Sequence, residues 1–96
     1  MLRITPVAAT PARVTLKLEG RLVADWASLL AEACQAARQA HRQVRLDLAE
    51  VTFIDGRGVA VLQRLAADGV ELLNPSAFAE ALLARAGVPY CRSEEA

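Results

Sequence analysis

Four consecutive residues near the middle of the chain, Asp55-Gly56-Arg57-Gly58, have types and spacing that could do chemistry. Asp is a preferred N-cap, so the Asp55 carboxylate is expected to accept the amide hydrogen of Arg57 or Gly58 at the start of a helix. The two glycines permit a tight corner and a close backbone approach. Exposed amides at a helix start could bind an anion or a nucleotide phosphate. Gly-Arg-Gly lacks most of the P-loop pattern, so a tight turn with a structural role is favoured over a phosphate-binding site.

The stability of the predicted helix does not explain why position 57 is an arginine. A cation in the first turn opposes the helix dipole and costs about 0.3–1 kcal/mol. A surface ion pair with Asp55 or Glu50 would offset that cost. A solvated arginine is the default interpretation, and contact with an acidic partner or a phosphate is the alternative.

The other reactive side chains form no catalytic or metal-binding set. His41, the only histidine, stands near a predicted helix end, and Cys34 and Cys91 lack metal-ligand spacing, so both are expected as free thiols. Thr52 and Ser76 are the hydroxyls nearest to two predicted helix starts, where capping or turn roles suffice. We therefore expect no enzyme, no metal and no cofactor.

The elements that hold the Asp55 corner follow from the hydrophobic pattern. The strand Val44–Leu48 has one apolar face, and Val51, Phe53 and Ile54 are expected to return the chain across the core as a short loop. The helix Arg57–Asp68 comes next. Its predicted buried side consists of Val59, Leu62, Leu65 and Ala66.

Before this region, Leu2–Thr5 is predicted as an edge strand that Pro6 stops, followed by a loop over Val7–Arg13. The alternation from Val14 to Glu19 predicts a strand pairing antiparallel with the first. A helix over Ala24–Ala40 follows. Its apolar stripe is Trp26, Leu29, Leu30, Ala33 and Ala37.

After the corner helix, Val70–Leu73 is predicted as a short strand, and Asn74 as the N-cap of a last helix that ends at Gly87. Phe78, Leu82 and Leu83 are expected to face inward. Val88–Arg92 is a candidate edge strand and Ser93–Ala96 is expected to fray. Strands alternating with helices imply parallel central strands joined by right-handed crossovers.

Length and charge set further limits. The 96 residues suffice for one domain over 1–96. Eleven basic residues balance eleven acidic ones with no basic run, which argues against nonspecific nucleic-acid binding. No signal peptide and no apolar run long enough for membrane insertion stand in the sequence, so a cytoplasmic protein is expected.

The central stretch resembles the STAS family, which is shared by sulfate transporters and bacterial anti-sigma-factor antagonists. The family has an apolar strand ending in Asp-Leu, an apolar pair, an Asp corner and a helix of small and apolar residues. The resemblance covers roughly Val14 to Gly87. The matching segments are Asp47-Leu48, Phe53-Ile54, Asp55, Gly58, the helix from Val59, Glu19-Gly20-Arg21-Leu22 and Leu73-Asn74-Pro75-Ser76.

The resemblance implies an α/β STAS fold, a small mixed sheet with parallel central strands and about three helices. It also implies a protein-interaction module that regulates transcription by docking a partner through the helix start. The partner would be an anti-sigma or kinase-like regulator, or the ATPase of a lipid-transport complex. The family's phosphorylated hydroxyl residue is Gly56 here, so no phosphorylation switch is expected there. The implied partner-binding residues are Asp55, Gly56, Arg57 and Gly58, with Val59 and Leu62 behind them.

Two alternatives stay open at this point. One is a sensor that binds a nucleotide or another anion at the corner amides and Arg57. The other is a homodimer without a regulatory role, built on apolar surface left exposed by the short helix after Gly58.

Overall fold

The structure is a computed structural model that describes residues 1–92. Four strands and three helices follow one another within these residues. In chain order they are β1 (Leu2–Ala9), β2 (Arg13–Leu22), α1 (Asp25–Ala40), β3 (Gln43–Ile54), α2 (Gly56–Ala67), β4 (Glu71–Leu73) and α3 (Ala77–Ala86).

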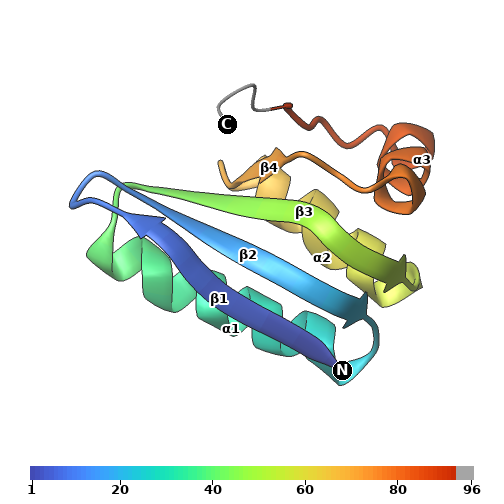
Figure 1. Cartoon of the computed structure of the whole chain (residues 1–96), viewed down its shortest axis with the longest axis horizontal. Coiled ribbons are helices and arrows are strands. Elements are labelled where there is room, and N and C mark those ends of the chain that lie inside the picture. The colour runs from blue at the N-terminus through green and yellow to red at the C-terminus, as the bar shows by residue number, and fades with distance from the viewer. Residues whose placement is uncertain (93–96) are drawn as a thin grey trace.

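The strands form one mixed sheet in the order β1-β2-β3-β4. β1 and β2 are antiparallel, whereas β2, β3 and β4 run parallel, as the sequence predicted. Helices α1 and α2 cover one face of the sheet, and α3 lies at its edge beside the second half of β3 (Figure 1). The three-residue β4 covers only Arg45–Asp47 of β3, and α3 lies beside the part of β3 that β4 does not reach.

The core lies between the sheet and the pair α1 and α2. Alternate residues of β2 and β3 point into it, which is the pattern of strands with one covered face. Burying one leucine completely contributes roughly 1.5–3 kcal/mol before entropy is counted. Leucines that are completely buried in this core include Leu18, Leu22, Leu30, Leu46, Leu48 and Leu62.

The first strand is longer than predicted. β1 continues through Pro6 to Ala9, with an irregularity between Pro6 and Ala8, and only residues 10–12 form the turn. An edge strand tolerates proline because one side of its backbone has no strand to pair with. The predicted stop at Pro6 was therefore wrong.

The third strand also extends beyond its predicted end. Val51, Phe53 and Ile54 belong to β3, which pairs with β2 as far as Leu22 opposite Ile54. Two register shifts in this pairing break the alternation of buried and exposed residues. The broken alternation explains why the segment resembled a loop.

The start of α3 differs from the prediction by two residues. Ser76, not Asn74, is the N-cap, since its hydroxyl accepts the amide hydrogen of Ala79 at 3.2 Å. Asn74 instead adopts a left-handed conformation with φ of 49°. Phe78 and Leu29 were expected in the core, but they are 40% and 47% exposed.

The C-terminal segment is anchored to α3 and β4. Tyr90 donates a hydrogen bond to Glu80 at 2.7 Å, and Arg92 forms an ion pair with the same carboxylate at 2.6 Å. The predicted edge strand is reduced to one bridge between Leu73 and Cys91. The predicted fraying of Ser93–Ala96 falls outside the described residues.

Both cysteines are free thiols, as predicted. Cys34 is buried against the core, and burial raises its pKa to about 11, partly opposed by the positive charge of Arg38. Cys91 is exposed. Because the thiolate is the reactive form, Cys34 is chemically inert at neutral pH.

Candidate functional site: the start of helix α2

The Asp55 carboxylate joins the starts of two helices. β3 ends at Ile54 and places Asp55 beside the loop that leads from β2 into α1. One carboxylate oxygen, Oδ1, accepts the amide hydrogen of Gly58 at 2.8 Å, and the other, Oδ2, accepts that of Ala24 at 3.0 Å. The Asp55 amide donates to the Leu22 carbonyl at 3.2 Å. The predicted N-cap is confirmed, and the same side chain also fixes α1.

These contacts favour the ionised carboxylate. The amide of Gly58 lowers the Asp55 pKa most, the amides of Ala24 and Arg57 and the Arg57 charge add to the effect, and partial desolvation opposes it. Ala24 has φ of 48° and ψ of −121°, a positive-φ conformation that is costly for a residue with a side chain. The bond to Asp55 helps to hold Ala24 in that conformation.

Gly58 is required by packing. A Cβ atom at this position would lie 2.5 Å from the Leu22 carbonyl oxygen and 2.7 Å from Cγ2 of Ile54. Such distances are below any normal contact, and the carbonyl is backbone that cannot simply rotate away. Gly58 therefore lets α2 begin directly against the end of β2.

Gly56 is a different case, although it lies only two residues away. It is exposed, and a Cβ atom there would meet nothing within 4 Å. Its φ lies outside the left-handed region. The missing hydroxyl is thus not dictated by space or by backbone conformation, since a serine or threonine would fit at this position.

Arg57 is exposed at the first turn of α2. Within residues 1–92 it makes no ion pair, so the pairing with Asp55 or Glu50 that would offset its cost is not formed at contact distance. Val59 is half-buried, and Gly58 and Leu62 are buried. The solvent-accessible part of the corner therefore consists of half-buried Asp55 and exposed Gly56 and Arg57.

The geometry is unfavourable for an anion at this corner. The Asp55 carboxylate already accepts from the amides of Gly58 and Ala24, and it places a negative charge at the helix start. An incoming phosphate would have to displace that carboxylate. The corner residues also line neither of the two pockets described below.

The remaining candidate side chains have structural partners. The Thr52 hydroxyl donates to the Gly20 carbonyl at 3.1 Å, and the Ser76 hydroxyl donates to the Val51 carbonyl at 2.7 Å. Nδ1 of His41 lies 2.7 Å from the Thr10 carbonyl oxygen. Across residues 1–92 no group of three His, Cys, Asp or Glu side chains is arranged to hold a metal ion.

The sequence interpretation missed an aromatic cluster next to this corner. The rings of Phe53 and Phe78 stack with centroids 5.5 Å apart and an interplanar angle of 27°, and the Arg21 guanidinium carbon lies 5.3 Å from the Phe53 centroid. These residues come from β3, α3 and β2. They are far apart in the chain: the register of β2 and β3 brings Arg21 to Phe53, and the packing of α3 against β3 brings Phe78 there, so no local pattern predicts the cluster.

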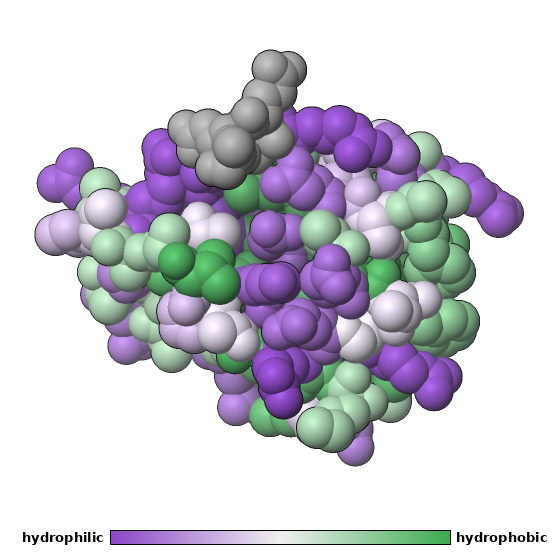
Figure 2. Space-filling view, viewed as in Figure 1, coloured by the Kyte–Doolittle hydropathy of each residue, from purple (hydrophilic) through white to green (hydrophobic). Residues whose placement is uncertain are grey.

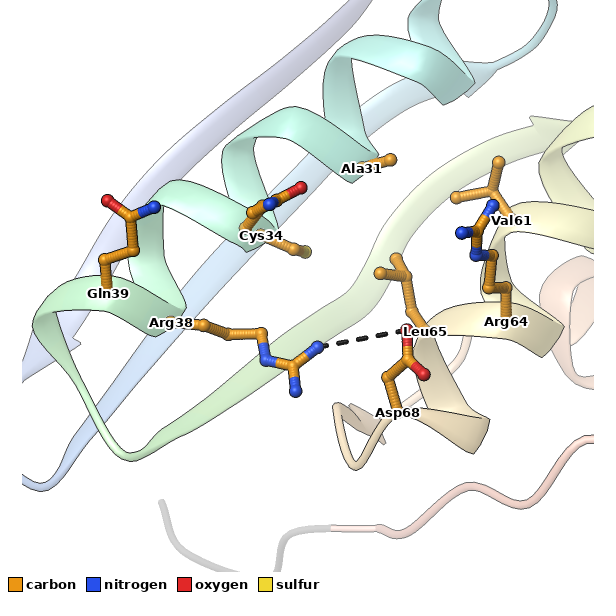
Figure 3. A pocket seen from close by; sticks show the side chains of 9 residues that line it. Ala31, Cys34, Arg38, Gln39, Val61, Arg64, Leu65 and Asp68 are labelled. Carbon is orange, nitrogen blue, oxygen red and sulfur yellow. Dashed lines mark ion pairs between the residues drawn. The ribbon is translucent and has the colours of Figure 1, made fainter.

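A pocket lies at the other end of the helix pair. It lies between the C-terminal halves of α1 and α2 and has a volume of about 530 Å³ (Figure 3). Arg38 and Asp68 face each other across its mouth at 3.9 Å, with Cys34 and Leu65 also in its lining. A second, smaller pocket lies between the end of α2 and the segment 86–89.

Within residues 1–92 no helix covers the face of the sheet opposite α1 and α2 (Figure 1). Hydrophilic side chains occupy the centre of this face, with hydrophobic surface on both sides (Figure 2). The helices described in residues 1–92 include none that is both long and apolar enough to cross a membrane.

An antiparallel strand pair, two parallel crossovers and a helix that starts at an exposed Asp corner define the class of small α/β domains to which the anti-sigma-factor antagonists belong. The chain belongs to the STAS domain family: its sequence matches the family described as "Mlab, STAS domain" over residues 5–89. The predicted fold and family are therefore confirmed. STAS domains are in general non-enzymatic regulatory modules.

Solved structures support the fold. The anti-sigma factor antagonist SpoIIAA in its unphosphorylated form superposes with a TM-score of 0.77 at 22% identity, over 97% of this chain and 90% of that one. A protein of the DUF3478 family from Shewanella loihica PV-4, described as having a SpoIIAA-like fold, gives a TM-score of 0.61 at 12% identity, over 98% and 86% of the two chains. No curated protein matches the sequence significantly.

Proposed function

We propose that this domain is a non-enzymatic protein-interaction module of the anti-sigma-factor-antagonist type. It docks a regulatory partner through the start of α2 and is not switched by phosphorylation at Gly56. The observation that carries the proposal is the contrast at the corner: Asp55 and Gly58 are fixed by packing and hydrogen bonds, whereas Gly56 and Arg57 are exposed on that fixed frame.

A rigid, exposed helix start suits recognition because its geometry does not have to be ordered when the partner binds. Phosphorylation at such a position would add a charge of about −2 and oppose docking of an acidic surface. With Gly56 the domain stays permanently in the binding form. Arg57 contributes a fixed positive charge to that surface.

A small-ligand sensor at the same corner is the weaker candidate. The amides that would bind an anion are already used by Asp55. The discriminating measurement is the melting temperature with and without nucleotide or phosphate, because a ligand at 100 times its dissociation constant adds about 2.7 kcal/mol of stability. We expect no shift.

The test of the proposal is affinity capture from a lysate of the native organism with four baits, the wild type and three variants. Gly56→Asp places a negative charge at the family's phosphorylation position, where the side chain has open space. Gly56→Ala changes the backbone preference without adding charge, and Ala36→Asp adds the same charge to an exposed position of α1. Circular dichroism confirms that each bait is folded.

A partner that binds the wild type, Gly56→Ala and Ala36→Asp but is released by Gly56→Asp supports docking at the start of α2. Equal retention by all four proteins contradicts it. Identification of the captured protein by mass spectrometry distinguishes an anti-sigma or kinase-like regulator from a lipid-transport ATPase, the two partner classes that the resemblance implies.

A further inference from the structure

An aromatic patch extends the start of α2 onto the face of the sheet opposite α1 and α2. The patch consists of Phe53, Phe78 and Arg21. The rings of Phe53 and Phe78 are stacked, yet the two residues remain 39% and 40% exposed. Arg21 pairs with Phe53 in the register of β2 and β3 and places its guanidinium over the Phe53 ring.

Contiguous exposed aromatic surface has a different meaning from scattered exposed residues. Met1, Val7 and Leu29 are exposed singly, as is normal for any soluble protein. Phe53 and Phe78 instead lie against each other. Aromatic side chains and arginine are the types enriched in the centres of protein interfaces, where they supply much of the binding energy.

The patch lies at the same end of β3 as the proposed docking corner, since the strand ends at Ile54 and Phe53 precedes Asp55 by two residues. Arg21 and Arg57 make no ion pair within the described part of the chain. Glu19 and Glu50, which pair with each other in the sheet, lie further back along the strands. Positive charge is thus available at the corner end of the patch and negative charge at the other end.

This distribution indicates the chemistry of the occupant. An apolar side chain fits the exposed rings, and carboxylates complement the two arginines. A nucleic acid would also stack on aromatic rings, but Glu19 and Glu50 oppose a polyanion along the strands, and the chain has no net positive charge.

We propose that the aromatic patch and Arg57 form one docking surface for an acidic amphipathic segment of a protein partner. The segment seats a large apolar side chain on Phe53 and Phe78 and places carboxylates beside Arg21 and Arg57. This inference rests on the proposed function and names the chemistry of its partner surface.

The test uses the full chain labelled with ¹⁵N and two synthetic amphipathic peptides of identical leucine pattern, one with glutamate and one with lysine at every polar position. The glutamate peptide is expected to shift the backbone amide signals of Arg21, Phe53, Arg57 and Phe78, and the lysine peptide is not. A single-stranded oligouridylate is the third probe.

Variants then test the side chains. The double variant Arg21→Glu and Arg57→Glu is expected to bind the glutamate peptide at least tenfold more weakly than the wild type. It is also expected to gain affinity for the lysine peptide. Phe53→Ser is also expected to weaken binding of the glutamate peptide, because it removes the ring on which the apolar side chain rests. The matched controls are Arg13→Glu, an exposed arginine at the other end of β2, and Leu29→Ser, an exposed apolar residue on α1.

The proposal is overturned if the glutamate peptide is not preferred, if the signals that shift belong to the groove between α1 and α2, or if the oligonucleotide binds more tightly. Its failure is distinguishable from failure of the proposed function. A captured partner released by Gly56→Asp but retained by the double arginine variant would leave docking at α2 intact and remove the patch from it. A captured partner retained by Gly56→Asp but released by Phe53→Ser would keep the patch and contradict docking at the start of α2.

Discussion

The two ends of the α1–α2 pair are fastened in different ways. At the N-terminal ends the Asp55 carboxylate holds the amides of Gly58 and Ala24 at 2.8 and 3.0 Å. At the C-terminal ends the link is an ion pair between Arg38 and Asp68 at 3.9 Å, whose side chains are 45% and 51% exposed, with a groove beside it. Short bonds to backbone fix the position of a helix, whereas a long ion pair between exposed side chains does not. The surface we propose for recognition is at the fixed end.

Among variants that test this difference between the two ends, Gly58→Ala is expected to change the stability most. The new Cβ would meet the Leu22 carbonyl oxygen at 2.5 Å, so α2 would have to move away from β2. We expect a loss of about 1–3 kcal/mol or more in the free energy of unfolding, measured by urea denaturation. Gly56→Ala is the control, expected to be neutral or to stabilise by up to about 1 kcal/mol, because its site is open. Equal loss in both variants would refute the assignment of separate roles to the two glycines.

A smaller effect is expected from Asp55→Asn, which separates the two bonds of this side chain. The amide oxygen can still cap α2 at Gly58, but an NH₂ group cannot accept the hydrogen bond from Ala24. The melting temperature should fall, by less than in Asp55→Ala, which loses both bonds. An unchanged melting temperature in Asp55→Asn would mean that the contact with Ala24 contributes nothing.

The same variant changes the response to acid. Because folding lowers the Asp55 pKa, its stabilising contribution is fully present above the unfolded value of about 4 and is lost as the pH falls through the folded pKa. Wild type should therefore lose more stability than Asp55→Asn below about pH 4. Parallel pH profiles of the two proteins would argue against a lowered pKa at this position.

The smallest change in stability is expected at the C-terminal ends of α1 and α2, which the Arg38–Asp68 ion pair joins. Arg38→Ala removes an exposed ion pair and should change the free energy of unfolding by no more than about 0.5 kcal/mol, with little dependence on salt. Urea denaturation at low and high salt measures it. A loss as large as that of Gly58→Ala would erase the difference between the two ends.

Features encoded in neighbouring residues were predictable from the sequence. The order of the elements, the parallel centre of the sheet and the Asp55 cap all depend on local periodicity and on the preference of Asp for one position. Ser76 and Asn74 show the limit of that approach. Both are good caps two residues apart, and only the left-handed conformation of Asn74 decides between them.

Features that depend on distant segments were not predictable. The bond from Asp55 to Ala24 spans 31 positions in the chain, and the cluster of Arg21, Phe53 and Phe78 joins three elements. Phe53 also lies where the register shifts of β3 break its alternation, so its exposure could not be read from spacing. Half of the proposed docking surface is therefore a product of tertiary structure alone.

The irregular edge strand has a consequence for the behaviour of the protein at high concentration. β1 has Pro6, which lacks an amide hydrogen, next to a register shift in the strand. A strand so interrupted is a poor template for another strand, because edge-to-edge growth requires an unbroken row of donors and acceptors. Addition of strands from other molecules to this edge, the first step toward a fibril, is thereby disfavoured.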